Sequence, residues 1–119
     1  MHETAVVAGL MRILDERAAA AGIDRVVSVR LRIGRLRGLD SRQIRSAFEL
    51  FAEGTIADGA RLEIDEVGVE AVCATCGTVW TVEGWRFECP SCGGSDAETR
   101  TGRELYVESF EGHRRSDPA

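Results

Sequence analysis

The order of hydrophobic and polar positions in the first third of the chain predicts a helix followed by a strand. Apolar residues recur at steps of three and four near the start, so they share one helical face. They are Val7, Leu10, Met11, Leu14 and Ala18. Gly22 is a natural left-handed stop for this helix. Apolar and polar residues then alternate, which predicts a strand with one buried and one charged face. Its buried face consists of Val27, Val29, Leu31 and Ile33.

A second helix and two more strands follow from the same reasoning. Gly34 and Gly38 bracket a turn, and Asp40 with Gln43 predicts a capping box. The apolar stripe of this helix is Ile44, Ala47, Phe48 and Phe51, and Gly54 ends it. Leu62 and Ile64 alternate with charged residues, which predicts a second strand.

The last strand pattern runs from Arg103 to Glu111. It places Leu105 and Val107 on one face, and Tyr106 and Phe110 on the other. From Gly112 onward the tail is expected to be disordered.

These elements predict an α+β fold in which two helices pack on a small three-stranded sheet, with an inserted zinc-ribbon module. The expected division is a domain of residues 1–69 plus 99–119 and a zinc-ribbon domain of residues 70–98. Its sidedness predicts that the last strand returns to the first sheet.

Composition argues against an enzyme. The chain has 119 residues, of which 15 are basic and 20 acidic, giving a net charge of −5. All the basic residues are arginine, which removes a P-loop lysine and Schiff-base chemistry. The two histidines, His2 and His113, lie near opposite termini and are poorly placed for acid–base catalysis.

The distribution of charge bears on location. The longest stretch without a charged residue, from Ala71 to Val82, is too short to span a membrane. Glu3 stands where a secretory signal would be basic, and Arg12 interrupts the apolar run. We therefore expect a cytoplasmic protein without a membrane partner.

The four cysteines form two Cys-x-x-Cys pairs, which is the ligand pattern of a zinc ribbon. The pairs are Cys73 with Cys76 and Cys89 with Cys92. Each pair aims two thiolates at one point, and a hairpin between them completes a tetrahedron. Short strands are expected at Thr78–Val82 and at Trp85–Glu88.

Three other interpretations of the cysteines stay open. Two disulfides are disfavoured because cytosolic chains rarely keep them. A redox-active site needs one pair beside a βαβ pattern, not two matched pairs. Iron bound by four thiolates fits the same spacing. Zinc is favoured, and because four protein ligands leave no open position, its role would be structural.

His2 follows the initiator Met1 directly and has two interpretations. A residue at this position ordinarily carries no function. Alternatively, the Met1 amine, the His2 amide and the His2 Nδ1 close two chelate rings around Ni(II) or Cu(II), with the amide or the carboxylate of Glu3 as a fourth ligand.

Several segments in register resemble one family. They are Met1-His2-Glu3, residues 29–36, residues 47–50, residues 54–64 and the paired cysteines. Together they resemble the HypA/HybF hydrogenase maturation factors, which are nickel metallochaperones. The resemblance extends to about Glu111.

The resemblance implies a function and a set of partners. His2 would be the nickel ligand, supported by the Met1 amine and Glu3, and the four cysteines would hold structural zinc. Ni(II) would pass to the large subunit of [NiFe] hydrogenase with the help of a HypB-type GTPase, and urease maturation proteins are a further possible client. The chain departs from the family at residues 40–43 and 67–69, where a proline is common, and neither segment contains a proposed ligand.

Other residues have simpler explanations beside functional ones. The arginines of the first half indicate a solvated strand face and turn, although a docking surface for an acidic partner is the alternative. They are Arg25, Arg30, Arg32, Arg35, Arg37, Arg42 and Arg45. Overall acidity opposes nucleic-acid binding. Trp80 and Trp85 are expected to pack the zinc module, and His113 is expected to be solvated. The rival class is a zinc-ribbon interaction module without nickel.

Overall fold

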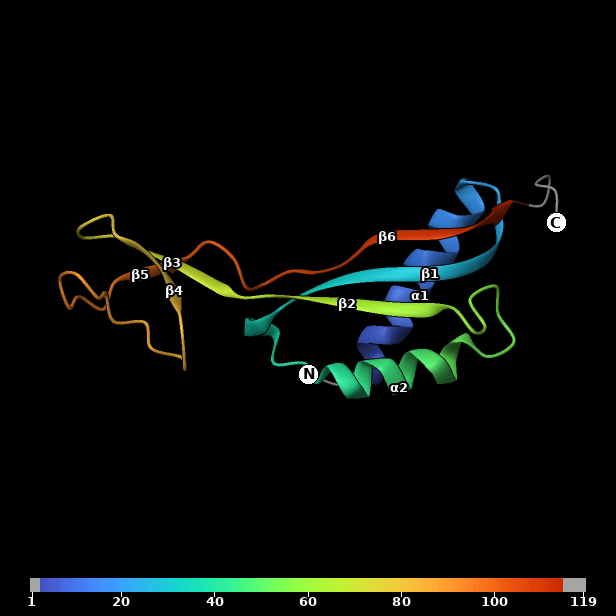
Figure 1. Ribbon diagram of the computed structural model, residues 1–119, viewed down its shortest axis with the longest axis horizontal. Coiled ribbons are helices and arrows are strands. Elements are labelled where there is room, and N and C mark those ends of the chain that lie inside the picture. The colour runs from blue at the N-terminus through green and yellow to red at the C-terminus, as the bar shows by residue number, and fades with distance from the viewer. Residues whose placement is uncertain (1–2, 115–119) are drawn as a thin grey trace.

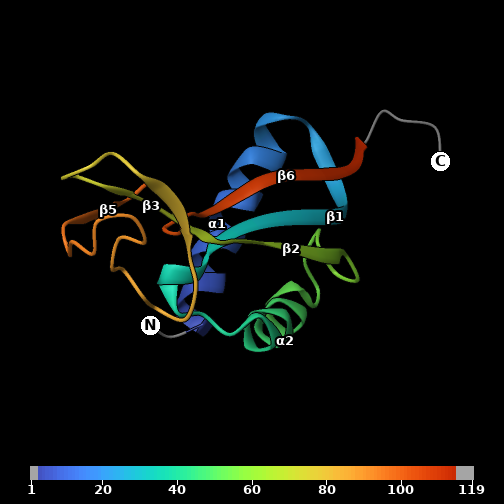
Figure 2. The ribbon, with the colours of Figure 1, turned by 60° about the vertical axis from the view of Figure 1, so that its left-hand side comes forward.

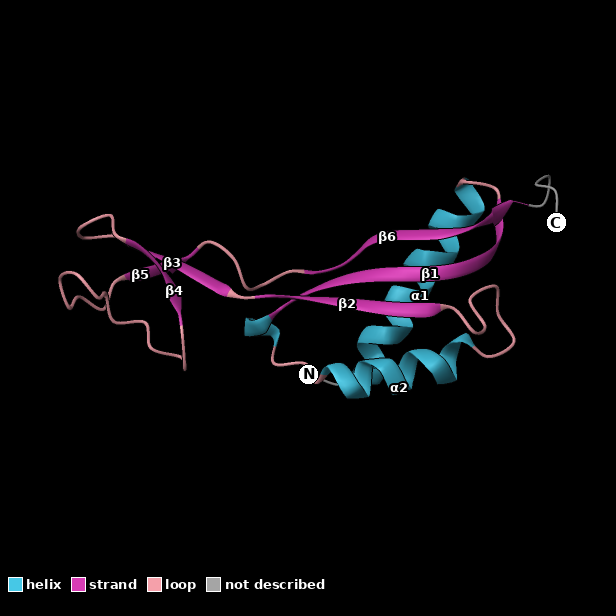
Figure 3. Cartoon of the chain, viewed as in Figure 1, coloured by secondary structure: helices cyan, strands magenta, loops and turns pink. Residues whose placement is uncertain are grey.

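The computed structural model describes residues 3–114, which form two sheets at opposite ends of an elongated molecule measuring 60 × 25 × 18 Å (Figure 1). Both α-helices lie at the end with the larger sheet (Figure 3). The elements in chain order are α1 (Glu3–Ala20), β1 (Ile23–Gly34), the 3-10 turn η1 (Arg35–Arg37), α2 (Ser41–Ala52), β2 (Arg61–Val67), β3 (Val69–Cys73), β4 (Val79–Val82), β5 (Ala97–Thr99) and β6 (Leu105–Arg114).

The larger sheet has the order β2-β1-β6, with β1 parallel to β2 and antiparallel to β6. The last strand therefore returns to the first sheet, as the sequence predicts. The two helices cover one face of this sheet and enclose the main core with it (Figure 2). All five apolar residues predicted on the first helix are buried. The predicted α+β class is confirmed.

Bulges in the β1–β6 ladder overturn two predictions about its residues. The register shifts between Val26 and Ser28, which buries Val26 and leaves Val27 39% exposed, so Val27 is not a core residue. A second shift between Arg30 and Leu31 turns Phe110 toward the core, although alternation predicts it beside exposed Tyr106. Each bulge adds one residue and thus exchanges the faces of all that follow.

The C-terminal ends of α2 and β6 also differ from the predictions. In α2, Ala52 is buried and Phe51 is 39% exposed, because the buried row follows the four-residue step from Ile44 through Phe48. The strand β6 continues to Arg114, so the predicted disorder from Gly112 is wrong within the described residues. Gly112 pairs with Val26 of β1, where a Cβ atom would lie 2.2 Å from the Arg25 carbonyl oxygen.

The smaller sheet has the order β4-β3-β5, with both outer strands antiparallel to β3. Its core contains three fully buried residues, Val69, Ala71 and Val82. The predicted strand over Trp85–Glu88 is wrong: Gly84 and Trp85 form a turn, in which Trp85 has a φ of 64°, and an irregular loop follows. The strands that pair with β3 are β4 and β5.

The two sheets meet where two glycines cross. The Gly34 N–H donates to the Glu104 carbonyl at 2.7 Å, and the Leu36 N–H donates to the Gly102 carbonyl at 2.8 Å. A Cβ atom on Gly34 would lie 2.1 Å from the Gly102 carbonyl carbon, so no other residue fits this approach. Leu36 then packs against the core of the smaller sheet. The small sheet is thereby placed beside the end of β1.

Candidate metal centre

The four cysteines lie on two turns with the same main-chain pattern. In the first turn the Gly77 N–H donates to the Cys73 carbonyl at 2.9 Å, and in the second the Gly93 N–H donates to the Cys89 carbonyl at 2.9 Å. Both glycines have positive φ values, 78° and 73°, which glycine adopts without strain. In each turn the first cysteine is buried and the second is exposed. Two equivalent knuckles therefore face each other.

The sulfur atoms are spaced as ligands of one tetrahedral ion. All four Sγ atoms lie within 4.8 Å of one another. The Cys73 and Cys92 sulfurs are 3.7 Å apart, and those of Cys76 and Cys89 are 3.6 Å apart. A tetrahedron with metal–sulfur bonds of about 2.3 Å has edges of about 3.8 Å, whereas a disulfide needs about 2.05 Å. All four are free thiols, and the donor set fits a tetrahedral metal ion.

The electrostatics of the thiols also favour a cation. The Thr78 hydroxyl, 3.2 Å from the Cys76 sulfur, lowers the pKa of Cys76 to about 6. Backbone N–H groups of Cys76 and Thr75 lower the pKa of Cys73. The pKa of Cys92 is raised to about 12: a backbone hydrogen bond from Gly94 lowers it, but the three neighbouring sulfurs outweigh that effect. Four thiolates at this spacing repel one another unless a cation neutralises them.

The coordination chemistry of this site is closed. Four protein sulfurs complete a tetrahedron, so no position is left for water or a substrate. Among residues 3–114 these cysteines form the only group of three or more metal-ligating side chains. His113 is exposed, pairs with Arg25 in the β1–β6 ladder, and belongs to no such group.

The predicted nickel chelate falls partly on residues 1 and 2, which lie outside the described residues. Of its three residues, Glu3 is described and begins α1. Its Oε2 accepts a hydrogen bond from the Asp40 backbone N–H at 3.0 Å, and this bond lowers the pKa of Glu3. The carboxylate at the start of the first helix is thus ionised and fixed against the N-terminus of the second.

This contact replaces half of the predicted capping box. Asp40 caps α2 through the Arg42 N–H, which donates to its Oδ1 at 2.9 Å. Its own N–H bonds to Glu3, which stands 37 residues earlier, and not to Gln43. Gln43 instead lines a groove beside Glu3, Thr4 and Leu50. A local sequence pattern gives no signal for such a long-range cap.

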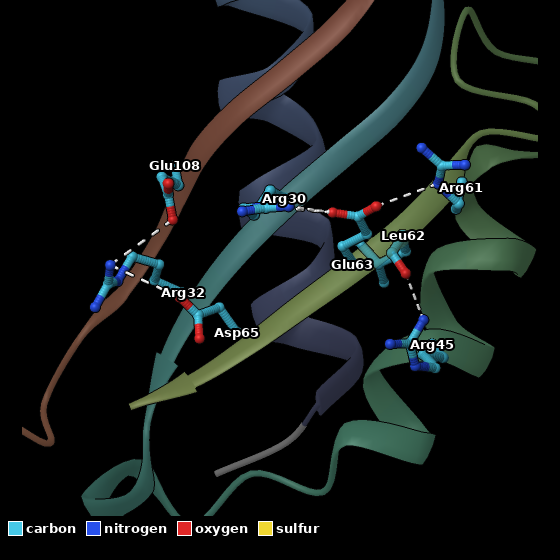
Figure 4. Close-up of polar contacts among 8 residues, drawn as sticks. All are labelled: Arg30, Arg32, Arg45, Arg61, Leu62, Glu63, Asp65 and Glu108. Atoms are coloured by element: carbon cyan, nitrogen blue, oxygen red, sulfur yellow. Dashed lines mark hydrogen bonds and ion pairs between the residues drawn. The ribbon is translucent and has the colours of Figure 1, made fainter. Parts of the chain in front are cut away.

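The arginines on the uncovered face of the larger sheet are mostly neutralised by neighbours (Figure 4). Arg30 bonds to Glu63 at 2.7 Å, and Arg32 lies 3.7 Å from Asp65 and 3.9 Å from Glu108. This agrees with the solvated strand face that alternation predicts.

Of the two tryptophans, only Trp80 packs against the core of the smaller sheet. Trp85 is 55% exposed, and the Arg35 guanidinium lies over its ring at 5.4 Å. The prediction that Trp85 packs the module is therefore wrong. Trp85 has a positive φ, and its ring lies beside Arg35 of η1.

Two helices on a mixed sheet, joined to a small sheet that carries a four-cysteine cluster, define a protein with a site suited to a tetrahedral metal ion. Comparison with known proteins sharpens this class. Residues 1–112 match the family model described as hydrogenase/urease nickel incorporation, metallochaperone, HypA. The chain therefore belongs to the HypA family, whose members are metallochaperones and not enzymes.

Relatives and solved structures agree with this assignment. The hydrogenase maturation factor HypA of Roseiflexus sp. is 39% identical over 112 residues, covering 93% of this chain and 91% of that protein. That of Caldanaerobacter subterraneus is 36% identical over 112 residues, covering 93% and 98%. The solution structure of the Ni metallochaperone HypA from Helicobacter pylori superposes with a TM-score of 0.71 at 27% identity, covering 97% of this chain and all of that one.

No helix among residues 3–114 is long and apolar enough to cross a membrane.

Proposed function

We propose that this chain binds Ni(II) at its N-terminus and delivers it to the large subunit of [NiFe] hydrogenase during maturation. The ligands are the Met1 amine, the His2 amide nitrogen and the His2 Nδ1, with Glu3 as the fourth. Nitrogen-rich, square-planar sets of this kind suit Ni(II). The family match, which includes the opening Met1-His2-Glu3, is the observation that carries the proposal.

The position of Glu3 supports this site. Because its carboxylate is ionised and bonded to the Asp40 N–H through Oε2, the chelating residues begin from a fixed point on the fold. The anchored carboxylate also places a negative charge beside the cation. Few ligands at the end of a chain allow nickel to leave by exchange into a better-coordinated recipient.

The four cysteines hold the resident metal, which we assign as zinc. Cys73, Cys76, Cys89 and Cys92 match the spacing of a tetrahedral thiolate site, although iron would accept the same donors. When bound, the metal supplies folding free energy to the segment and no reactivity. We further propose that residues 70–98 form this zinc-ribbon domain and residues 1–69 plus 99–119 the nickel-binding domain.

The energy for delivery comes from a partner. The chain has no lysine and thus no P-loop, so a HypB-type GTPase is the proposed companion. Urease maturation proteins are the second client that the family description allows. Four free thiols suit a reducing compartment, and we propose that delivery takes place in the cytoplasm.

Nickel titration by calorimetry tests the proposal on protein with a native, unblocked start. Wild-type chain should bind about one Ni(II), and His2→Ala should abolish this binding while the zinc content stays at one per chain. His113→Ala removes the only other histidine and is the matched control, which should bind nickel normally. Unchanged nickel affinity in His2→Ala, or in a chain extended before Met1, would leave only the zinc-ribbon interaction module.

A further inference from the structure

The larger sheet has two long free edges. Its outer strands, β2 and β6, contain seven and ten residues. Main-chain groups on the outer side of such strands form a template on which another strand can pair. The smaller sheet limits this hazard by length, since β4 and β5 contain four and three residues. Lysine, a common guard of exposed edges, is absent from the sequence.

An arginine from α1 occupies the outer side of β6. The Arg17 Nη1 donates to the Val107 carbonyl at 2.8 Å, and its guanidinium lies over the Phe110 ring at 5.6 Å. The Glu104 carbonyl accepts a bond from Gly34 of β1, so it points inward. Because successive residues of a strand point their main-chain groups to opposite sides, the Val107 carbonyl points away from β1. Arg17 therefore holds an acceptor that an added strand would need.

An arginine from α2 likewise bonds to a main-chain carbonyl of β2. The Arg45 Nη1 donates to the Leu62 carbonyl, as the dashed line in Figure 4 marks. Arg17 and Arg45 thus reach opposite edges of one sheet from the two helices that cover it. Neither forms an ion pair with a carboxylate anywhere in residues 3–114.

We propose that Arg17 and Arg45 are edge guards that keep the sheet from pairing with a second copy of this chain. A strand added to β6 must take the Val107 carbonyl and displace the Arg17 guanidinium. The displaced cation would then lie against the new sheet without its acceptor, which costs desolvation. The same holds for Leu62 and Arg45. The two arginine contacts therefore oppose the addition of a strand to either edge.

The two edges predict two kinds of assembly. Opening β6 alone allows an antiparallel β6–β6 pair, which closes as a two-fold dimer. Opening both edges allows each sheet to bind neighbours on two sides, and such contacts continue into open-ended assemblies. The number of guards removed should therefore set the size of the product.

Sedimentation of the full chain tests this with Arg17→Met, Arg45→Met and the double variant. Methionine keeps the aliphatic stem and removes the donor. Arg12→Met is the matched control, because Arg12 is exposed on α1 and has no edge contact. We expect Arg17→Met to dimerise about tenfold more tightly than wild type, because one charge-assisted hydrogen bond no longer has to be broken. The double variant should form larger assemblies than this dimer. In the associated samples, amide exchange should slow at Val107 in Arg17→Met protein, at Leu62 in Arg45→Met protein, and at both in the double variant.

The contrary results are equally specific. The proposal is wrong if the double variant keeps its far-UV circular dichroism and sediments as the wild type does from micromolar to millimolar concentration. Equal association of Arg12→Met would assign the effect to lost charge. Association without slower exchange on the strand whose arginine was replaced would place the contact on another surface.

Discussion

The sheet β2-β1-β6 shares a core of sixteen buried residues with two helices, whereas the sheet β4-β3-β5 has a core of three. Burying one valine or leucine side chain contributes about 1.5–3 kcal/mol, and ordering each residue costs about 1–2 kcal/mol. The smaller sheet cannot offset the ordering of its segment by burial alone. The difference indicates that the helical end folds through its core and the other end through its metal.

Removing the metal should break this comparison most strongly. Cys89 is 2% exposed, and Cys89→Ser deletes one thiolate from the tetrahedron. Structural zinc contributes about 10–16 kcal/mol of apparent binding free energy to small domains. We therefore expect hydrogen exchange in β3, β4 and β5 to become fast, while β1 and β6 stay protected.

Ser91→Ala, which changes an exposed residue of the same knuckle, is the control and should keep both the metal and the protection. Persistent protection of the smaller sheet in metal-free Cys89→Ser protein would contradict the inference that this sheet depends on its metal to fold.

A core truncation should give the opposite pattern at the other end. Leu14 is 1% exposed in α1, and Leu14→Ala should destabilise the helical end by about 2–5 kcal/mol through lost burial and a cavity. Thermal unfolding measures the loss, and metal analysis should still find one zinc per chain. Ile13→Ala, at a 45% exposed position of the same helix, should shift the transition little. Zinc release in Leu14→Ala protein would show that the two ends do not fold separately.

A smaller effect concerns a polar contact within the helical end. The Asp40 N–H lowers the pKa of Glu3 below 4.5, so the ionised form is favoured in the folded state. The contribution is fully present above pH 4.5 and is lost as the pH falls through the lower, folded value. The protection factor of the Asp40 amide, which compares its exchange rate with the intrinsic rate at the same pH, should fall below that window in wild-type protein, and Glu3→Gln should remove this fall. The same fall in the Asp40 protection factor in Glu3→Gln protein would assign the effect to another group.

How far the sequence predicts the fold differs between elements. Period and propensity are local, so the helices, the first strand and the knuckles follow from the residues themselves. Bulges are not local, because they depend on which strand lies opposite. For that reason the burial of Val26 and Phe110, and the exposure of Val27, could not be derived from alternation.

The candidate site divides in the same way. The two cysteine pairs could be predicted to bring their sulfurs together, because the sequence pattern of each knuckle is complete within five residues. The hydrogen bond between Glu3 and Asp40 joins residues 37 apart, and no local sequence pattern predicts it. Trp85 illustrates a third case: its left-handed backbone reverses the direction of a side chain whose type alone favours burial.

The crossing of Gly34 and Gly102 has a consequence for how the molecule tolerates change. Main chain touches main chain there, so any side chain at Gly34 would force the two segments apart, although Leu36 beside it also packs against the core of the smaller sheet. Substitutions elsewhere can reshape the surfaces of the two sheets, but a substitution at Gly34 must move the backbone. The angle between the cysteine-bearing tip and the helical body is thus inherited from backbone geometry.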